Sequence, residues 1–323
     1  MSDNTIKSFA FRTIITAITL VLCLFAAEIL LRVKNSDGKN YHIEMWKYSR
    51  DLKHSSDNPV LGHEHVPNDQ AKLQNVIIRT NEKGMRGSKI PAAQNGQRRI
   101  MLLGSSATLG WGIKEEETMS SVLQERLGKS AVVMNAGIGN YNAQRYVELF
   151  LSKNTDMKPT DIIVNYYLND AEILGQGGGN FIIRNSELAV TFWILFNRIF
   201  GEKGEATLLD HYKSIYEPDY QGLIQVKESL AKLAYYAEHH GINLYLMMMP
   251  EVHDLENYQY QFAHDIMAEI AHDNGYIYID GLPALQNTKN TQDLWAMPGD
   301  PHPNAHAHAL FADAIYPSLT QQK

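Results

Sequence analysis

Three residues of this chain have side chains that together can carry out nucleophilic catalysis. Ser106 follows one short apolar run, and His302 lies near the far end with Asp300 two residues before it. A serine hydroxyl becomes a good nucleophile when an imidazole takes its proton, and the imidazole needs an acceptor that fixes its tautomer. The pattern therefore predicts that Ser106 attacks, His302 acts as the base and Asp300 orients the imidazole.

Attack on a carbonyl also creates negative charge on its oxygen, which preorganised hydrogen-bond donors must stabilise. Three donors are available near the ends of apolar runs. They are the backbone N–H of Ser106, the backbone N–H of Asn140 in a glycine-containing turn, and the side-chain amide of Asn169. We expect these groups to form an oxyanion site.

The elements that must position these groups are short apolar strands alternating with amphipathic stretches. Near-continuous apolar strands separated by helices are typical of a parallel sheet covered on both faces. Open sheets of this kind bind their ligands at the carboxyl ends of the strands. We therefore predict a three-layer α/β/α fold with a five-stranded parallel sheet. Its strands are expected at 100–103, 131–135, 161–168, 243–250 and 276–280, with helices at 118–127, 142–153 and 220–240, at 260–274, and from the His302 loop through Tyr316.

The N-terminus carries a long apolar run from Thr13 to Leu31, in which Glu28 is the one charged residue. At about 1.5 Å per residue, such a run can just cross a hydrocarbon core of about 30 Å. A cleaved signal peptide is the alternative, but the bulky Leu24 and Phe25 do not suit a cleavage site, and no small residue stands directly before Cys23 for lipidation. We expect an uncleaved single-pass anchor.

These features divide the chain into an anchor at 1–35, an extended arm at 36–97 that packs on the domain near its end, and a catalytic domain at 98–323. A strand at 74–81 is expected within the arm. Within the domain, glycines at 175–179 precede an apolar segment around Trp193. This segment is either a helix packed on the core, a cap over the site (a possible insertion at 175–215) or a patch against the bilayer.

Several other functions are not favoured by the composition or by the motifs. The formal net charge of −7 gives no basic excess for nucleic acid, and a single cysteine, Cys23, cannot form an internal disulfide. The glycines around Ser106 match neither a P-loop nor a dinucleotide fingerprint. Of His302, His306 and His308, only the first two would share a helix face, so we expect no metal and no other cofactor.

Four short segments of the chain, around Ser106, Asn140, Asn169 and His302, form four sequence blocks in this order. Taken together, these blocks resemble the SGNH (GDSL-type) hydrolases, whose name lists serine, glycine, asparagine and histidine in chain order. The resemblance spans about 61–319 and includes the segment 78–87, as in a membrane-anchored or exported subgroup. It implies a flavodoxin-like sheet. It also implies that the nucleophile is Ser106, that the asparagine of the oxyanion site is Asn169, and that Asp300 and His302 complete the triad.

The chain departs from the family pattern at four points. Ser105 replaces the aspartate of Gly-Asp-Ser, and the third block is Tyr167-Leu168-Asn169-Asp170 where Gly-x-Asn-Asp is usual. Asn140, beside Gly139, replaces the second-block glycine, and Asp300 lies two rather than three residues before the histidine.

The function expected from these observations is a membrane-anchored serine esterase. The resemblance and the anchor together favour O-acyl esters, in particular O-acetyl esters, on a cell-envelope glycan, although a small-molecule ester also fits. The resemblance implies an extracytoplasmic, periplasmic domain, whereas basic residues flank both ends of the anchor and do not decide its orientation. Two alternatives stay open: a polysaccharide O-acetyltransferase that uses the same site, and an inert SGNH-like domain that binds a glycan or a partner. The sequence carries no signal for an oligomeric state.

Overall fold

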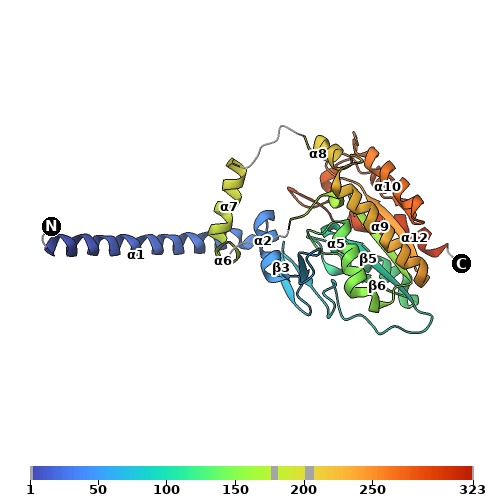
Figure 1. Cartoon of the computed structure of the whole chain (residues 1–323), viewed down its shortest axis with the longest axis horizontal. Helices are drawn as coiled ribbons and strands as arrows, with labels where there is room; N and C mark the ends of the chain where they lie inside the picture. The colour runs from blue at the N-terminus through green and yellow to red at the C-terminus, as the bar shows by residue number, and fades with distance from the viewer. Residues whose placement is uncertain (1–2, 176–180, 201–206, 322–323) are drawn as a thin grey trace. The chain divides into compact units, whose positions relative to one another are not determined.

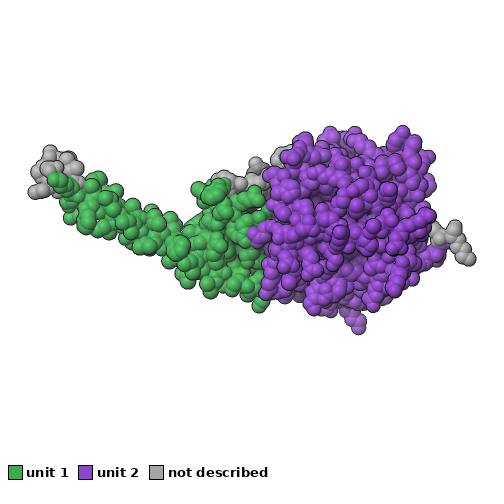
Figure 2. Space-filling view, turned by 90° about the horizontal axis from the view of Figure 1, so that it is seen from below, with its two compact units in different colours: residues 1–50, 178–203 green, residues 51–177, 204–323 purple. Residues whose placement is uncertain are grey.

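The computed structural model describes residues 3–175, 181–200 and 207–321. The chain divides into two compact units, which Figure 2 shows in different colours. Unit 1 comprises residues 1–50 and 178–203, and unit 2 comprises residues 51–177 and 204–323.

Unit 1 is dominated by a long N-terminal helix, α1 (Asp3–Lys34) (Figure 1). The helical stretch Lys7–Asp37 is long and apolar enough to cross a membrane, and none of its most apolar window is buried. It is therefore a candidate transmembrane span, and the expected apolar helix is confirmed. A short 3-10 turn, η1 (Asn35–Asp37), and helix α2 (Tyr41–Asp51) follow.

Two later helices of unit 1, α6 (Phe181–Asn185) and α7 (Glu187–Phe200), meet the C-terminal part of α1. The carboxylate of Glu28 accepts hydrogen bonds from the hydroxyl of Ser186 at 2.9 Å and from the backbone N–H groups of Glu187 at 3.0 Å and Leu188 at 2.8 Å. These are the orphan donors at the start of a helix, so Glu28 caps α7 and fixes its first turn on α1. In Figure 1, α7 runs across the direction of α1.

Unit 2 is built around one sheet of five parallel strands in the order β6-β5-β7-β8-β9. With the strands numbered along the chain this is the order 2-1-3-4-5, which is that of flavodoxin-like sheets. The predicted fold class is confirmed, and the predicted strands agree with the observed ones to within a few residues. The strands are β5 (Arg98–Gly104), β6 (Ala131–Asn135), β7 (Asp161–Tyr167), β8 (Asn243–Met249) and β9 (Ile277–Asp280).

Alternating side chains of these strands enter two cores, one on each face of the sheet. On one face, residues such as Leu103 and Val164 pack with α5 (Ala143–Leu149), α9 (Gln221–His240) and α10 (Gln261–Asp273). On the other face, residues such as Leu102 and Met247 pack with α4 (Met119–Leu127), α11 (Leu282–Leu285) and α12 (Ala305–Thr320). Because both faces are covered, every strand is apolar on both sides, which is why these runs were recognisable in the sequence. The helices of unit 2 are α3 (Ser106–Leu109), α4 (Met119–Leu127), α5 (Ala143–Leu149), α8 (Leu208–Ile215), α9 (Gln221–His240), α10 (Gln261–Asp273), α11 (Leu282–Leu285) and α12 (Ala305–Thr320).

Three small antiparallel pairs complete the described part of unit 2. The sequence predicts only one strand among them, at 74–81, and this strand corresponds to β4 (Val76–Arg79), which pairs with β3 (Gln70–Leu73). Each pair has strands of three or four residues, too short to show a periodic pattern in the sequence. The pairs are β1 (Lys53–Ser55) with β2 (His63–His65), β3 (Gln70–Leu73) with β4 (Val76–Arg79), and β10 (Trp295–Met297) with β11 (Asp300–Pro303).

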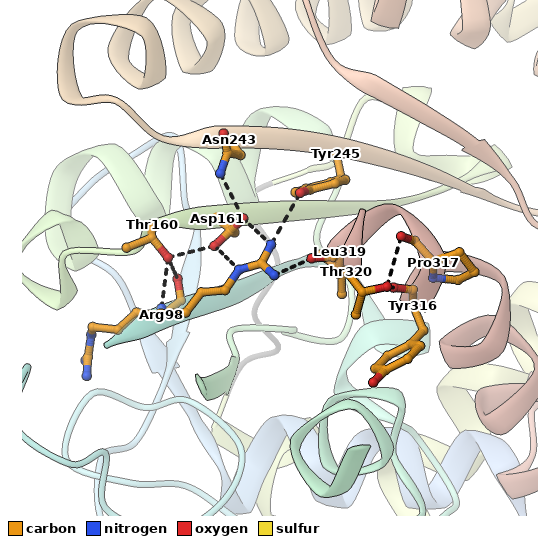
Figure 3. A network of polar contacts seen from close by, with 10 residues as sticks. Arg98, Thr160, Asp161, Asn243, Tyr245, Tyr316, Pro317, Leu319 and Thr320 are labelled. Atoms are coloured by element: carbon orange, nitrogen blue, oxygen red, sulfur yellow. Dashed lines mark hydrogen bonds and ion pairs between the residues drawn. The ribbon is translucent and has the colours of Figure 1, made fainter. Parts of the chain in front are cut away.

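The amino ends of the central strands are joined by a partly buried ion pair, drawn in Figure 3. The guanidinium of Arg98 donates to both carboxylate oxygens of Asp161, at 2.7 and 2.6 Å. Thr160 and Asn243 donate to the same carboxylate at 2.6 and 3.1 Å. Burial would raise the pKa of Asp161, but these donors hold the pKa below its usual value. The network links β5, β7 and β8 at the edge opposite their carboxyl ends.

Candidate active site

The first strand of the sheet delivers Ser106 to the carboxyl edge. Gly104 ends β5 with a φ of +159°, and a Cβ placed there would lie 2.1 Å from the hydroxyl of Thr108 and 2.8 Å from the carbonyl oxygen of Asn165. Only glycine therefore lets the chain turn so closely over the neighbouring strand. Ser106 begins α3, so its backbone N–H has no partner within the helix.

The base comes from the other end of the chain, on the β10–β11 hairpin. His302 Nε2 lies 2.8 Å from Ser106 Oγ, and His302 Nδ1 lies 2.6 Å from an oxygen of Asp300. A carboxylate can only accept a hydrogen bond, so Nδ1 carries the proton and donates it to Asp300. Nε2 is then the acceptor for the Ser106 hydroxyl. The structure brings together the three residues that the sequence analysis assigned to catalysis, in the order that such a triad requires.

Asp300 is itself held by two residues to which the sequence analysis gave no role. Gln74 Nε2 donates to its second oxygen at 2.5 Å, and the indole N–H of Trp111 donates to the same oxygen at 3.1 Å. Burial would raise the pKa of Asp300, but the hydrogen bonds from His302 and Gln74 hold it below its usual value. Asp300 is therefore a charged acceptor at neutral pH. Gln74 lies in the β3–β4 turn, and no local pattern links it to a loop more than two hundred residues away.

The expected oxyanion residues lie on the loops after β6 and β7, the two strands that flank β5 in the sheet. Asn140 and Asn169 are both exposed, and no hydrogen bond joins either side chain to Ser106 among the described residues. Their roles remain predictions. Asn140 has a φ of +63°, a left-handed conformation that asparagine tolerates better than most other non-glycine residues. Asparagine can therefore occupy a position whose backbone conformation otherwise favours glycine.

The loop that carries Asn140 is held against the helix that carries Ser106. Ile138 N donates to Gly104 O at 3.2 Å, and a Cβ on Gly137 would lie 2.3 Å from the backbone nitrogen of Leu109. Gly137 is therefore needed for the close approach of the two backbones.

Beside Asn169, the carboxyl group of Asp170 is fully buried and accepts a hydrogen bond from the backbone N–H of Tyr167 at 3.1 Å. Burial raises the pKa of Asp170 to about 8. The folded state thus holds a proton that the unfolded chain releases near pH 4. The resulting stability is present below pH 4 and is lost as the pH rises toward 8.

Asp170→Asn should therefore stabilise the fold relative to the wild type by an amount that grows with pH. The difference in the free energy of unfolding should increase by up to about 1.4 kcal/mol per pH unit between pH 5 and 8. Chemical denaturation of both proteins at several pH values measures it. Asp273→Asn, at an exposed position on α10, is the matched control and should show no such trend. A difference that stays constant with pH would contradict the assignment of a neutral Asp170.

His306 and His308, weighed above as metal ligands, lie on α12. His308 is buried, and its Nδ1 accepts a hydrogen bond from the backbone N–H of Met119 at 3.1 Å. Among the residues that the structure describes, no group of three or more histidine, cysteine, aspartate or glutamate side chains could hold a metal ion.

Comparisons with known proteins found similarity only at the level of structure. A scan against protein-family models found no match, and a search of the curated proteins found none either. Solved structures similar to this chain include TesA, with 15% identity, a TM-score of 0.46, and coverage of 69% of this chain and 98% of the other. A catalytic mutant of Axe2, an acetylxylan esterase from Geobacillus stearothermophilus, has 13% identity, a TM-score of 0.47, and coverage of 71% and 98%. The psychrotrophic esterase EstA from Pseudoalteromonas has 16% identity, a TM-score of 0.42, and coverage of 70% and 98%.

Proposed function

We propose that this chain is a membrane-anchored serine esterase of the SGNH type that hydrolyses O-acyl esters, in particular O-acetyl esters on a cell-envelope glycan. One observation carries the proposal: the continuous hydrogen-bonded chain from Ser106 through His302 to Asp300, at the carboxyl edge of a parallel sheet. The glycan substrate rests on the resemblance of the sequence blocks together with the candidate anchor.

In the proposed reaction, Ser106 Oγ bonds to the ester carbonyl carbon while its proton passes to His302 Nε2. The charge that develops on the carbonyl oxygen is stabilised by the N–H groups of Ser106 and Asn140 and by the side-chain amide of Asn169. His302 then gives the proton to the oxygen of the leaving alcohol as the ester C–O bond breaks. Water, deprotonated by His302, attacks the acyl-serine, releases the carboxylic acid and restores Ser106.

A fluorophosphonate probe tests the nucleophile directly, because it phosphonylates only an activated serine. We expect the full chain in detergent to be labelled on Ser106, with the modified residue identified by peptide mass spectrometry, and to hydrolyse p-nitrophenyl acetate. Absence of labelling in folded protein would contradict the proposal and would support the inert, binding-only alternative.

Hydrolysis and transfer are separated by product analysis. The enzyme is incubated with an acetylated glycan, or with an acetyl donor and an unmodified glycan. Release of acetate from the first mixture supports the esterase. Acetyl groups that appear on the glycan in the second mixture, without hydrolysis in the first, would support the O-acetyltransferase alternative.

The membrane part of the proposal rests on α1 and on the apolar face of α7. Phe192, Trp193 and Phe196 on α7 are each more than half exposed. Since Glu28 fixes the start of α7 on the candidate membrane span, the bilayer is the partner that can cover these side chains. We therefore infer that α7 lies in the membrane interface, in place of the cap considered for 175–215.

Cys23, exposed on α1 and the only cysteine of the chain, reports on the anchor. In isolated membranes it should resist a membrane-impermeant maleimide and should react once detergent and denaturant are added, because lipid shields it. Phe196→Cys, introduced in a Cys23→Ser background, should be protected in the same way, whereas Asp273→Cys should react at once. Labelling of Asp273→Cys in intact spheroplasts indicates a periplasmic domain, and rapid labelling of Cys23 would contradict the anchor.

A further inference from the structure

The carbonyl group of Gly139 is held by two residues of the β1–β2 pair. Lys53 Nζ donates to this oxygen at 2.7 Å, and His63 Nε2 lies 3.1 Å from it. Lys53 is almost completely buried, with 6% of its surface exposed. A buried ammonium group that reaches a loop carbonyl is unusual, because desolvating a charge costs free energy that its contacts must offset.

The same peptide unit carries the backbone N–H of Asn140 on its other side. The peptide between Gly139 and Asn140 is trans, since no cis bond occurs in the described residues, and in a planar trans peptide the C=O and N–H groups point in opposite directions. The N–H of Asn140 therefore points away from Lys53. Within the described part of the chain it has no backbone partner. The Gly139 carbonyl oxygen is therefore held by hydrogen bonds, while the Asn140 N–H is left to donate to a ligand. We call the hydrogen bond from Lys53 to the Gly139 carbonyl the clamp.

We propose that Lys53 is a positioning residue for the ester reaction: its ammonium group clamps the Gly139 carbonyl and so aims and polarises the Asn140 N–H toward the oxyanion. This inference rests on the proposed function. It concerns a residue that does not contact the substrate and that lies outside every block of the family resemblance.

Two physical effects make the clamp useful. A fixed carbonyl removes the rotational freedom of the peptide unit, and Asn140 would otherwise hold a left-handed backbone conformation without this support. In addition, a hydrogen bond to a charged donor withdraws electrons from the amide, so that the N–H becomes a stronger donor where charge develops.

The charge of the clamp depends on pH. Burial, together with the nearby guanidinium of Arg145 on α5, lowers the pKa of Lys53 to about 7. From β2, His63 and His65 also face this group. Burial lowers the pKa of each of them to about 3, so both are neutral at working pH, and Nε2 of His63 acts as a donor to the carbonyl. The charged clamp is thus present below pH 7 and is lost as the pH rises above it.

Kinetics of Lys53→Met and Lys53→Arg in the full chain test the proposal. Lys53→Met should lower kcat about tenfold to a hundredfold, less than the loss of a whole oxyanion donor, with little change in KM. The wild type should show a decline in kcat above pH 7 that Lys53→Met lacks. Lys53→Arg keeps its charge at every accessible pH, so it should recover most of kcat and should also lack the decline. Lys72→Met, at an exposed position on β3, should behave as the wild type.

The outcomes separate this inference from the function on which it depends. If the wild type hydrolyses esters and Lys53→Met matches its kcat and pH profile, the clamp is overturned. If Lys53→Met does not fold, a decline above pH 7 that persists in Lys53→Arg overturns it equally. If the wild type is neither labelled by fluorophosphonate nor active on esters, the proposed function itself fails.

Discussion

Ser106→Ala is expected to reduce ester hydrolysis by the full chain by on the order of 10³- to 10⁶-fold and to abolish fluorophosphonate labelling. The hydroxyl of Ser106 is the group that bonds to the acyl carbon, and its proton has an acceptor 2.8 Å away in His302 Nε2. Without it, the remaining donors can only bind the substrate and stabilise attack by water. Steady-state kinetics with an activated acetyl ester measure the loss.

The neighbouring serine provides the matched control. Ser105 has the same hydroxyl group, but it is buried, whereas Ser106 Oγ is the hydroxyl that lies 2.8 Å from His302 Nε2. Ser105→Ala should therefore still be labelled by the probe on Ser106. Retention of hydrolysis in Ser106→Ala, or loss of labelling only in Ser105→Ala, would show that the nucleophile has been assigned wrongly.

Asp300→Asn is expected to have the second-largest effect, a loss of roughly 10⁴-fold in kcat. The reason lies in the two donors that Gln74 and Trp111 direct at one carboxylate oxygen. The single amide oxygen of asparagine must face these donors, so its NH₂ group is turned toward His302 Nδ1. Nδ1 then has to accept a hydrogen bond, the proton moves to Nε2, and the imidazole can no longer take the proton of Ser106.

The kinetic and structural readouts of this variant can be checked independently. Nitrogen NMR of the histidine ring should report the proton on Nδ1 in the wild type and on Nε2 in Asp300→Asn. Asp293→Asn, an exposed aspartate close to the same hairpin, should leave kcat unchanged. A loss of less than tenfold in Asp300→Asn would mean that another group orients His302.

Much of the fold could be predicted because its information is local. Each central strand is apolar on both faces, and each is bounded by polar loops and amphipathic helices, so the succession of short apolar runs and amphipathic stretches predicts the strands. The short strands of the other pairs lack such a pattern. The β10–β11 hairpin that carries His302 was expected only as a loop, since a strand of three or four residues has too few positions to alternate.

The candidate site could be predicted in part for a similar reason. Ser106, Asn169 and His302 each follow or precede a recognisable element, and their order along the chain matches a known family pattern. Gln74, Trp111 and Lys53 offered no such signal. Gln74 and Lys53 reach the site from the segment between the anchor and the first central strand, and a contact between residues so distant in the chain depends on how the hairpins pack.

What the sequence determined by itself is therefore the set of elements and the chemical identity of the groups at their ends. The length and the period of an apolar run indicate whether it buries its surface in a sheet, in a helix or in a bilayer. The tertiary structure alone decided which further groups meet at the site: the two donors that hold the Asp300 carboxylate, and the ammonium on the Gly139 carbonyl. Hydrogen bonds act over about 3 Å, so these contacts exist only after the chain has folded.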